Sequence, residues 1–348
     1  MGISSPHDRE KYDETSIRLS ANQFLADDAV AGDVIGGGRN SKVYRLIDSN
    51  GSQYALKVYF HHKADTRDRL WTEFKSLQFL WNNGFRDIPR PFIVEHTRGY
   101  GVYEFIEGRR IVNLTETELF VAIEFLVRLK KLREQARQTS IGAASEACFS
   151  GNTLLGNIRQ RLDLLIDQAD IYSDLKGFLK GEFVPAFNVI DEWCRTRMPF
   201  DVELDRLEIS LSPSDFGFHN ALQRMSNGQF VFLDFEYFGW DDPAKTISDF
   251  LLHPAMNLTD ELKRLFATQV LRHFEECPNL EERVETLYPL YGLKWCLILL
   301  NEFLPDRLQR RQFVREFDLN SVQKEQLAKA RFMLHRIIRE YEKFPYFD

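Results

Sequence analysis

Hydrophobic positions repeat with two different periods along the chain. In segments 34–36, 42–48 and 53–59, β-branched and aromatic residues are interspersed with polar ones, which predicts strands. Asn50-Gly51 lies between the second and third segments and predicts a tight hairpin, because these residue types accept positive φ angles. From residue 70 to 81 the apolar side chains recur every three or four positions, which predicts a helix that ends by Gly84. Further strands, one of them over 101–106, are expected after Pro91.

The chain beyond Gly108 is predicted to be mainly helical. Thr115 and Glu118 have the pattern of a capping box, and apolar residues continue one helical face to 129. Further helices are expected over about 153–172, over about 176–197, and after residue 236 to the C-terminus. A loop and hairpin are expected over about 210–236, with the turn of the hairpin at Asn227-Gly228. We therefore predict an α+β fold with a polar lead-in (1–30), a β-rich N-lobe (31–106) and a helical C-lobe (107–348).

Composition narrows the class of protein. A chain of 348 residues is longer than one core usually serves, which favours two lobes. The net charge of −7 argues against a general nucleic-acid binder. The four cysteines form no CxxC pair, so neither a zinc site nor a disulfide framework is indicated. The N-terminus lacks the apolar stretch of a signal peptide and no apolar run could span a bilayer, so we expect a cytoplasmic protein without a membrane partner. The oligomeric state is left open.

A glycine-rich segment stands between two predicted strands. Gly36, Gly37 and Gly38 are followed by Ser41 and Val43. Without a Cβ in the way, backbone N–H groups there can approach phosphate oxygens. A Walker loop or dinucleotide-binding loop would continue into a helix, whereas a strand follows here. Taken alone, the segment also fits a plain turn.

Lys57 lies in the third predicted strand among apolar neighbours. An ammonium in such a place needs a partner, and nucleotide phosphates would supply one. Glu73, on the following helix, could hold the ammonium in place, whereas Asp68 lies nearer the helix start and is a poorer candidate. A surface lysine and a solvated glutamate are the alternatives for either residue alone.

Three polar residues combine around the predicted hairpin. Asp215 lies in a loop, Asn220 follows five residues later, and Asp234 comes directly after an apolar run. Phosphoryl transfer to a hydroxyl needs a carboxylate that orients and deprotonates the nucleophile, and hard oxygen ligands for Mg²⁺. Asp215 is therefore a candidate base, and Asn220 and Asp234 are candidate metal ligands. Singly, each of them also fits a turn or a strand end.

The order of these motifs resembles the aminoglycoside phosphotransferase and choline kinase family, the small-molecule branch of the protein-kinase-like fold. Residues 233–237 resemble the metal-binding segment of choline kinases, and residues 239–244 with Asp249 resemble both subfamilies. The resemblance spans about residues 33–250. It implies a bilobal protein-kinase-like fold, ATP and Mg²⁺ between the lobes, and transfer of the γ-phosphoryl group to a hydroxyl of a small metabolite.

The resemblance also implies roles for individual residues. Asp215 would be the catalytic base, Asn220 and Asp234 would bind Mg²⁺, and Lys57, held by Glu73, would bind the α- and β-phosphates. Residues 103–106 would form the hinge that meets the adenine edge. The implied ATP-binding residues are Gly36, Gly38, Ser41, Val43, Ala55, Lys57, Glu73, Tyr103, Glu104, Phe105, Ile106 and Leu222.

The acceptor is less well defined. In relatives the region near the C-terminus lines the acceptor pocket, which makes Trp295 and Glu302 candidates, with Trp240 as a third. Packing within an amphipathic helix is the alternative for each. A sugar, an amino sugar, an amine alcohol and an aminoglycoside all remain candidates, and the net acidity mildly favours a cationic one.

The catalytic loop departs from the family pattern. Pro213 and Ser214 stand where many relatives have histidine and glycine, and His219 could take over some of the bracing. A catalytically inactive nucleotide-binding regulator of the same fold is therefore the alternative function, although the presence of Asp215, Asn220 and Asp234 together favours the enzyme. A protein kinase is disfavoured because no activation segment follows Asp234. Asp249 would brace the catalytic loop.

Overall fold

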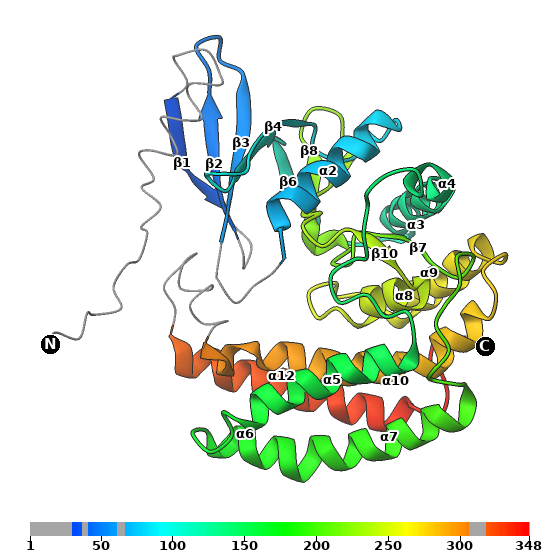
Figure 1. Ribbon diagram of the computed structural model, residues 1–348. Coiled ribbons are helices and arrows are strands. Elements are labelled where there is room, and N and C mark those ends of the chain that lie inside the picture. The colour runs from blue at the N-terminus through cyan, green and yellow to red at the C-terminus, as the bar shows by residue number, and fades with distance from the viewer. Residues whose placement is uncertain (1–29, 37–40, 61–66, 306–317, 348) are drawn as a thin grey trace, which may run out of the picture.

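A computed structural model describes residues 30–36, 41–60, 67–305 and 318–347. A sheet with one helix forms one lobe, and a larger, mostly helical lobe lies below it (Figure 1). The predicted lobe boundary at 106/107 falls between strands β5 and β6, defined below. No helix in these described ranges is long and apolar enough to cross a membrane.

Five antiparallel strands form the N-lobe sheet in the order β1-β2-β3-β5-β4. The elements of this lobe are β1 (Val30–Gly36), β2 (Ser41–Ile47), β3 (Gln53–Tyr59), α2 (Arg69–Asn82), β4 (Pro91–Glu95) and β5 (Tyr100–Glu104). The predicted β2–β3 hairpin is present, but of its Asn-Gly pair only Gly51 has a positive φ. The Asp48 carboxylate completes the turn by accepting hydrogen bonds from the backbone N–H groups of Asn50 and Ser52.

Successive side chains along β3 point to opposite faces of the sheet. Leu56 and Val58 join a small buried cluster on one face. Lys57 and Tyr59 lie on the other face, where both side chains contact Glu73 of α2. The alternation thus turns Lys57 toward the helix that carries its partner.

The C-lobe contains short strands and a set of packed helices. Its elements are β6 (Gly108–Arg110), α3 (Glu116–Lys131), α4 (Arg133–Ala136), α5 (Gly151–Ile166), α6 (Ser173–Phe178), η1 (Leu179–Phe183), α7 (Val184–Arg197), β7 (Ser210–Ser212), η2 (Phe218–Asn220), β8 (Ala221–Arg224), β9 (Phe230–Phe232), β10 (Gly239–Asp241), α8 (Pro243–Leu252), α9 (Asp260–His273), α10 (Leu280–Leu299), η3 (Leu300–Phe303) and α12 (Leu319–Glu340). The capping box of Thr115 and Glu118 is present at the start of α3. The helix expected over about 153–172 corresponds to α5, which ends at Ile166. The helix expected over about 176–197 is divided into α6, η1 and α7.

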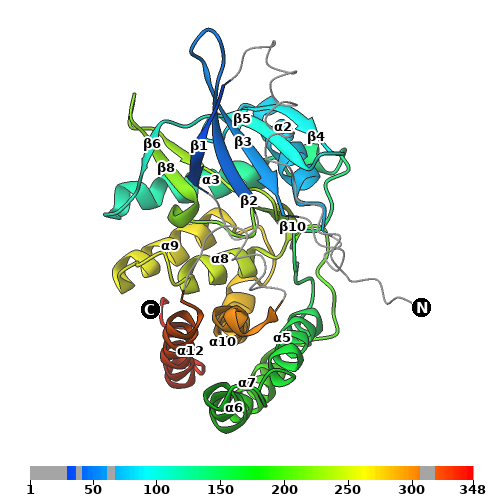
Figure 2. The same cartoon turned by 90° about the vertical axis from the view of Figure 1, so that its left-hand side faces the viewer.

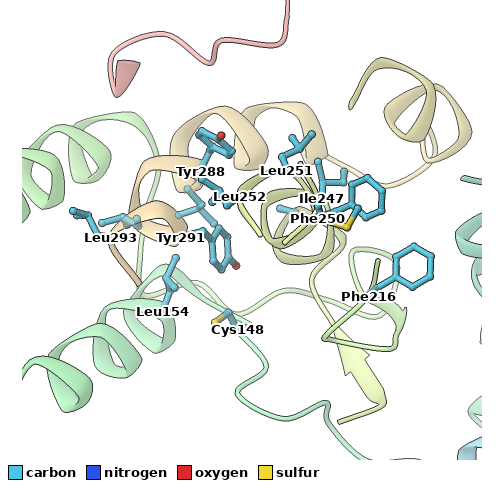
Figure 3. Packing of buried hydrophobic residues seen from close by; sticks show 14 of the residues in the cluster. Cys148, Leu154, Phe216, Ile247, Phe250, Leu251, Leu252, Tyr288, Tyr291 and Leu293 are labelled. Carbon is cyan, nitrogen blue, oxygen red and sulfur yellow. The ribbon is translucent and has the colours of Figure 1, made fainter. Parts of the chain in front are cut away.

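Helix α10 forms the centre of the C-lobe. Figure 2 shows it between α12 and α5, and it also packs against α8 and α7. Most of its residues are buried, as expected for a helix with neighbours on several sides. Figure 3 shows Tyr288, Tyr291 and Leu293 of this helix in the core beside the α8 side chains.

The loop that carries Asp215 is attached to this core by the next residue. The ring of Phe216 lies 5.4 Å from that of Phe125 on α3, 4.9 Å from Phe232 on β9 and 5.9 Å from Phe250 on α8, measured between centroids. Phe216 and Phe250 are both labelled in Figure 3. Such aromatic contacts stabilise the core and restrict the loop. The packing of Phe216 into the core therefore fixes the position of Asp215.

Candidate active site

Lys57 is the centre of a buried ionic network between the lobes. Its Nζ lies 2.6 Å from Oε2 of Glu73 and 2.6 Å from Oδ1 of Asp234. Oε2 of Glu73 also accepts a 2.6 Å hydrogen bond from the Tyr59 hydroxyl, which lies 2.9 Å from the hydroxyl of Tyr103. The structure therefore brings together Lys57, Glu73 and Asp234, which are far apart in the sequence. Asp68, the poorer candidate for the partner of Lys57, caps the N-terminus of α2.

The charges of this network determine the pKa values of its members. Burial opposes the charged form of Lys57, but the carboxylates of Asp234 and Glu73 hold its pKa well above the usual value. Burial raises the pKa of Glu73, with Lys57 acting in the opposite direction. Burial and the charge of Asp234 raise the pKa of Glu236 to about 7. Lys57 is thus a fixed positive charge beside Asp234.

Three carboxylates gather beside this ammonium. Oxygen atoms of Glu73, Asp234 and Glu236 all lie within 4.8 Å of one another. Asp234 has a φ of 67°, an uncommon backbone conformation for an aspartate, which often marks a functional position. Carboxylate oxygens are the ligands that Mg²⁺ prefers, so the donor set at Asp234 fits this ion.

Asp215 and Asn220 are connected through the loop backbone. The Asn220 side-chain amide donates a 3.0 Å hydrogen bond to the backbone carbonyl oxygen of Asp215. With its nitrogen anchored in this way, the amide oxygen of Asn220 is oriented separately and can serve as a metal ligand. A Cβ at Gly217 would lie 2.5 Å from Sδ of Met256, so a larger residue in the loop would require the Met256 side chain to move. The loop thus holds the candidate base and a candidate metal ligand in one unit.

Two histidines contact the candidate base. Nε2 of His219 lies 3.0 Å from Oδ1 of Asp215, and Nε2 of His253 lies 3.8 Å from the same atom. The two imidazole rings are stacked with centroids 3.7 Å apart. Burial would raise the pKa of Asp215, but the hydrogen bond and charge of His219 hold it below its usual range. Sequence reasoning named His219 as a brace but missed His253, which is distant in the chain.

A cavity of about 540 Å³ opens beside these residues. It is lined by Asp215, Asn220 and Asp234, and also by Trp295 and Glu302, two of the three acceptor-site candidates. The third, Trp240 on β10, does not line it, and its ring centroid lies 5.4 Å from Cζ of the Arg137 guanidinium. The volume suits a small molecule.

Asp249 contacts Trp295, which lines the cavity, rather than the loop that carries Asp215. Its Oδ1 accepts a 2.8 Å hydrogen bond from the Trp295 indole, and its Oδ2 lies 3.5 Å from Nζ of Lys245. Lys245 contacts the loop in its place, with a 3.0 Å hydrogen bond to the Ser214 hydroxyl. Sequence reasoning missed Lys245, because no motif distinguishes a buried lysine from an exposed one on a helix.

The candidate adenine-binding residues lie on the strands above the cleft. Val43 pairs with Lys57 across the β2–β3 ladder, and Ala55 pairs with Tyr103 across β3–β5. The Glu104 N–H already donates to the Arg90 carbonyl, which leaves the backbone of residues 105 and 106 to meet a ligand.

The remaining ATP-binding candidates border this region. Leu222 lies on β8 of the C-lobe, Gly36 ends β1, and Ser41 begins β2 with its side chain buried. Gly38 lies outside the described residues.

The sequence pattern of the phosphotransferase enzyme family matches residues 32–286, most of the chain. The chain belongs to this family. No curated protein matches it at a significant level.

Solved structures similar to this phosphotransferase include small-molecule kinases. They include choline kinase from Cryptosporidium parvum Iowa II, 12% identical over 94% of this chain and 97% of that one, with a TM-score of 0.63. The gentamicin complex of APH(2″)-IIa is 18% identical over 99% of both chains, with a TM-score of 0.60. Plasmodium vivax ethanolamine kinase is 14% identical over 90% of this chain and 86% of that one, with a TM-score of 0.56. These similarities confirm the predicted bilobal protein-kinase-like fold.

Proposed function

We propose that this phosphotransferase is a small-molecule kinase that transfers the γ-phosphoryl group of ATP to a hydroxyl group of a metabolite. The observation that carries the proposal is the arrangement of Asp215, Asn220 and Asp234 around one cavity, with Lys57 paired to Asp234. A regulator that only bound nucleotide would need Lys57, but it would have no use for an ionised carboxylate that faces the cavity from the opposite lobe.

Asp215 is assigned as the base. Its side chain is 36% exposed, and its lowered pKa keeps it ionised at neutral pH. Because His219 donates to Oδ1, we assign proton acceptance to Oδ2. As the acceptor oxygen bonds to the γ-phosphorus, its proton passes to Asp215, and the bond from the γ-phosphorus to the β–γ bridging oxygen breaks and releases ADP.

Asn220 and Asp234 are assigned to Mg²⁺, and Lys57 to the α- and β-phosphates. When bound, Mg²⁺ neutralises charge on the phosphates. Lys57, with its pKa held high, adds a positive charge that does not depend on pH near neutrality. Glu73 and Tyr59 position this ammonium, and the backbone of residues 105 and 106 would receive the adenine edge. The cytoplasmic location expected from the sequence is part of this proposal, because ATP is available there.

The names of similar proteins suggest which acceptors to try first. Choline kinase, ethanolamine kinase and a gentamicin-binding phosphotransferase resemble this chain in fold. An acceptor panel should therefore contain amine alcohols, sugars, amino sugars and aminoglycosides.

The decisive experiment measures ADP release with Mg-ATP across this panel for the wild type and for Asp215→Asn. We expect the variant to lose about 10³-fold in kcat, since a positioned base contributes a factor of this order. Its affinity for the non-hydrolysable analogue AMP-PNP should stay within twofold of wild type, as measured by calorimetry. Asp234→Ala should instead weaken Mg-AMP-PNP binding itself. Full turnover in Asp215→Asn would refute the assignment of the base, and nucleotide binding without turnover in the wild type would favour the regulator.

A further inference from the structure

The part of the cavity beyond Asp215 has a wall of charged residues that sequence reasoning did not identify. Glu146 lies in the segment before α5, Arg161 lies on α5, and Lys294 lies on α10. All three line the same cavity as Trp295 and Glu302. This wall is where an acceptor would contact the protein.

Glu146 is a fixed anion shared by two cations. Its carboxylate forms an ion pair with Arg161 and lies 3.1 Å from Nζ of Lys294. Burial would raise its pKa, but Lys294 and Arg161 hold it below its usual range. Its backbone has a φ of 54°, and the preceding residue, Ser145, donates a hydrogen bond to the carbonyl of Tyr237. The segment that carries Glu146 is thus attached to the strand region behind the catalytic loop.

Lys294 and Arg161 together carry more N–H donors than the Glu146 carboxylate can accept. An ammonium has three N–H donors and a guanidinium has five. Within the described part of the chain, Lys294 and Arg161 both pair with Glu146. Neither cation has a second hydrogen-bonding or ion-pair partner among these residues. The Lys294 residue is only 3% exposed, so solvent reaches little of its ammonium. A buried cation with unused donors that borders a cavity is suited to bind an anion.

Two of the carboxylates that line the cavity near Lys294, those of Glu146 and Asp249, are already engaged. Glu146 is shared by two cations, and Asp249 is bound by the Trp295 indole and lies beside Lys245. At either of these two carboxylates, a cationic acceptor would have to displace a donor or a cation while lying next to Lys294. Like charges at such distances in a partly buried site repel strongly. The wall therefore disfavours a polycationic acceptor, contrary to the mild expectation from the net charge of the whole chain.

We propose that the acceptor carries an oxyanion, a carboxylate or a phosphate, in addition to the hydroxyl that is phosphorylated, and that Lys294 and Arg161 bind this oxyanion. The inference rests on the proposed kinase function. Glu146 spaces the two cations and keeps them in the wall. Trp295, whose indole is held by Asp249, covers the carbon skeleton between the oxyanion and Asp215.

The test compares acceptors that share a skeleton and differ in one group. Glycerol, glycerate, glycerol phosphate and aminopropanediol form one series, and glucose, gluconate, glucose 6-phosphate and glucosamine form a second, with homoserine and kanamycin added. ADP release with Mg-ATP gives kcat/KM for each. We expect an acidic member to exceed its neutral and amine counterparts by at least about tenfold, as a buried charged contact provides. The carboxylate and phosphate members distinguish the two sources of the oxyanion.

Substitutions of Lys294 and Arg161 then test whether these residues bind the oxyanion. Lys294→Gln should raise KM for the acidic acceptor by about tenfold or more and leave KM for ATP within twofold, and Arg161→Gln should act in the same direction. Arg159→Gln is the matched control, because Arg159 lies on the same helix, pairs with Asp191 and is 53% exposed. If Lys294→Gln does not fold, Arg161→Gln carries the test.

The outcomes separate this inference from the kinase assignment. Best turnover with a neutral or amine acceptor, unaffected by both variants, would overturn the oxyanion site and leave the kinase intact. If no acceptor releases ADP, calorimetry on protein saturated with Mg-AMP-PNP decides. Binding of an acidic compound that Lys294→Gln abolishes would support the site, while the lack of turnover would count against the kinase. Failure of every acidic compound to bind better than its neutral counterpart would overturn the site.

Discussion

The ammonium group of Lys245 donates a 3.0 Å hydrogen bond to the hydroxyl of Ser214, the residue directly before Asp215. Lys245 is 2% exposed and also lies 2.7 Å from Oδ2 of Asp241, which is fully buried. Ser214 has a φ of 67°, so its backbone is held in a conformation that few non-glycine residues adopt. An α8 lysine thus fixes the strained turn that presents the candidate base.

Ser214→Ala is expected to reduce turnover without weakening substrate binding. Removing the hydroxyl frees the turn to relax and moves Asp215, which should lower kcat by about tenfold while KM for ATP and for the acceptor stay within twofold. Steady-state kinetics with both substrates varied would measure this. Ser210→Ala is the matched control, since this buried β7 hydroxyl makes no hydrogen bond with the described residues. A lower melting temperature with unchanged kcat would show that the contact is purely structural.

Glu73→Gln is expected to weaken the use of ATP. The substitution removes the charge that shares Lys57 with Asp234, so the ammonium would stay with Asp234 and be less available to phosphates. We expect kcat/KM for ATP to fall roughly 10- to 100-fold, with KM for the acceptor little changed. Asp68→Asn, at the cap of the same helix, is the control and should leave kinetics unchanged. Equal kcat/KM for ATP in Glu73→Gln and wild type would contradict this role.

Local patterns in the sequence were sufficient for the elements that hold the site. The apolar repeat of α2, the capping box at Thr115 and the Asn227-Gly228 turn depend on neighbouring residues, and all three are present in the structure. The helix expected over 176–197 was placed correctly but is interrupted by η1, a π-helical turn that periodicity does not distinguish from an α-helix.

The contacts that shape the acceptor wall could not be predicted in this way. Lys245 and Ser214 are 31 positions apart, and the partners of Glu146 lie on two helices, α5 and α10. No local pattern marks a lysine that will be buried against a carboxylate, because burial follows from how α5, α8 and α10 pack. Motif order was enough to predict the nucleotide half of the proposed site, whereas the proposed acceptor half depends on how distant helices pack.

Stability should depend on pH through Lys263 of α9. Burial, and to a lesser degree the charge of Arg336, lowers the pKa of Lys263 to about 8. Between about pH 8 and 10 the unfolded chain therefore binds more protons at this residue than the native protein, so the free energy of unfolding contributed by Lys263 rises with pH. Lys263→Gln should stabilise the protein at pH 7 by about 1 kcal/mol, a value reduced for screening because the side chain is partly exposed. Urea denaturation at pH 7 and pH 10 would test this, and a difference between variant and wild type that does not shrink at pH 10 would contradict it.

Gly239→Ala should destabilise the protein through a backbone clash beneath the acceptor wall. A Cβ at Gly239 would lie 2.5 Å from the backbone nitrogen of Ala144 and 2.5 Å from the carbonyl oxygen of Gly142. That segment cannot easily move away, because Trp240 exchanges backbone hydrogen bonds with Gly142 and Ala144. We expect a loss of about 3 kcal/mol in the free energy of unfolding, measured by urea denaturation, together with weaker acceptor binding because the same segment carries Glu146. Gly142→Ala is the matched control and should change stability by less than about 0.5 kcal/mol, since no atom lies within 4 Å of its Cβ position. Equal stability of Gly239→Ala and wild type would mean that this segment is free to shift, and with it the carboxylate that spaces Arg161 and Lys294.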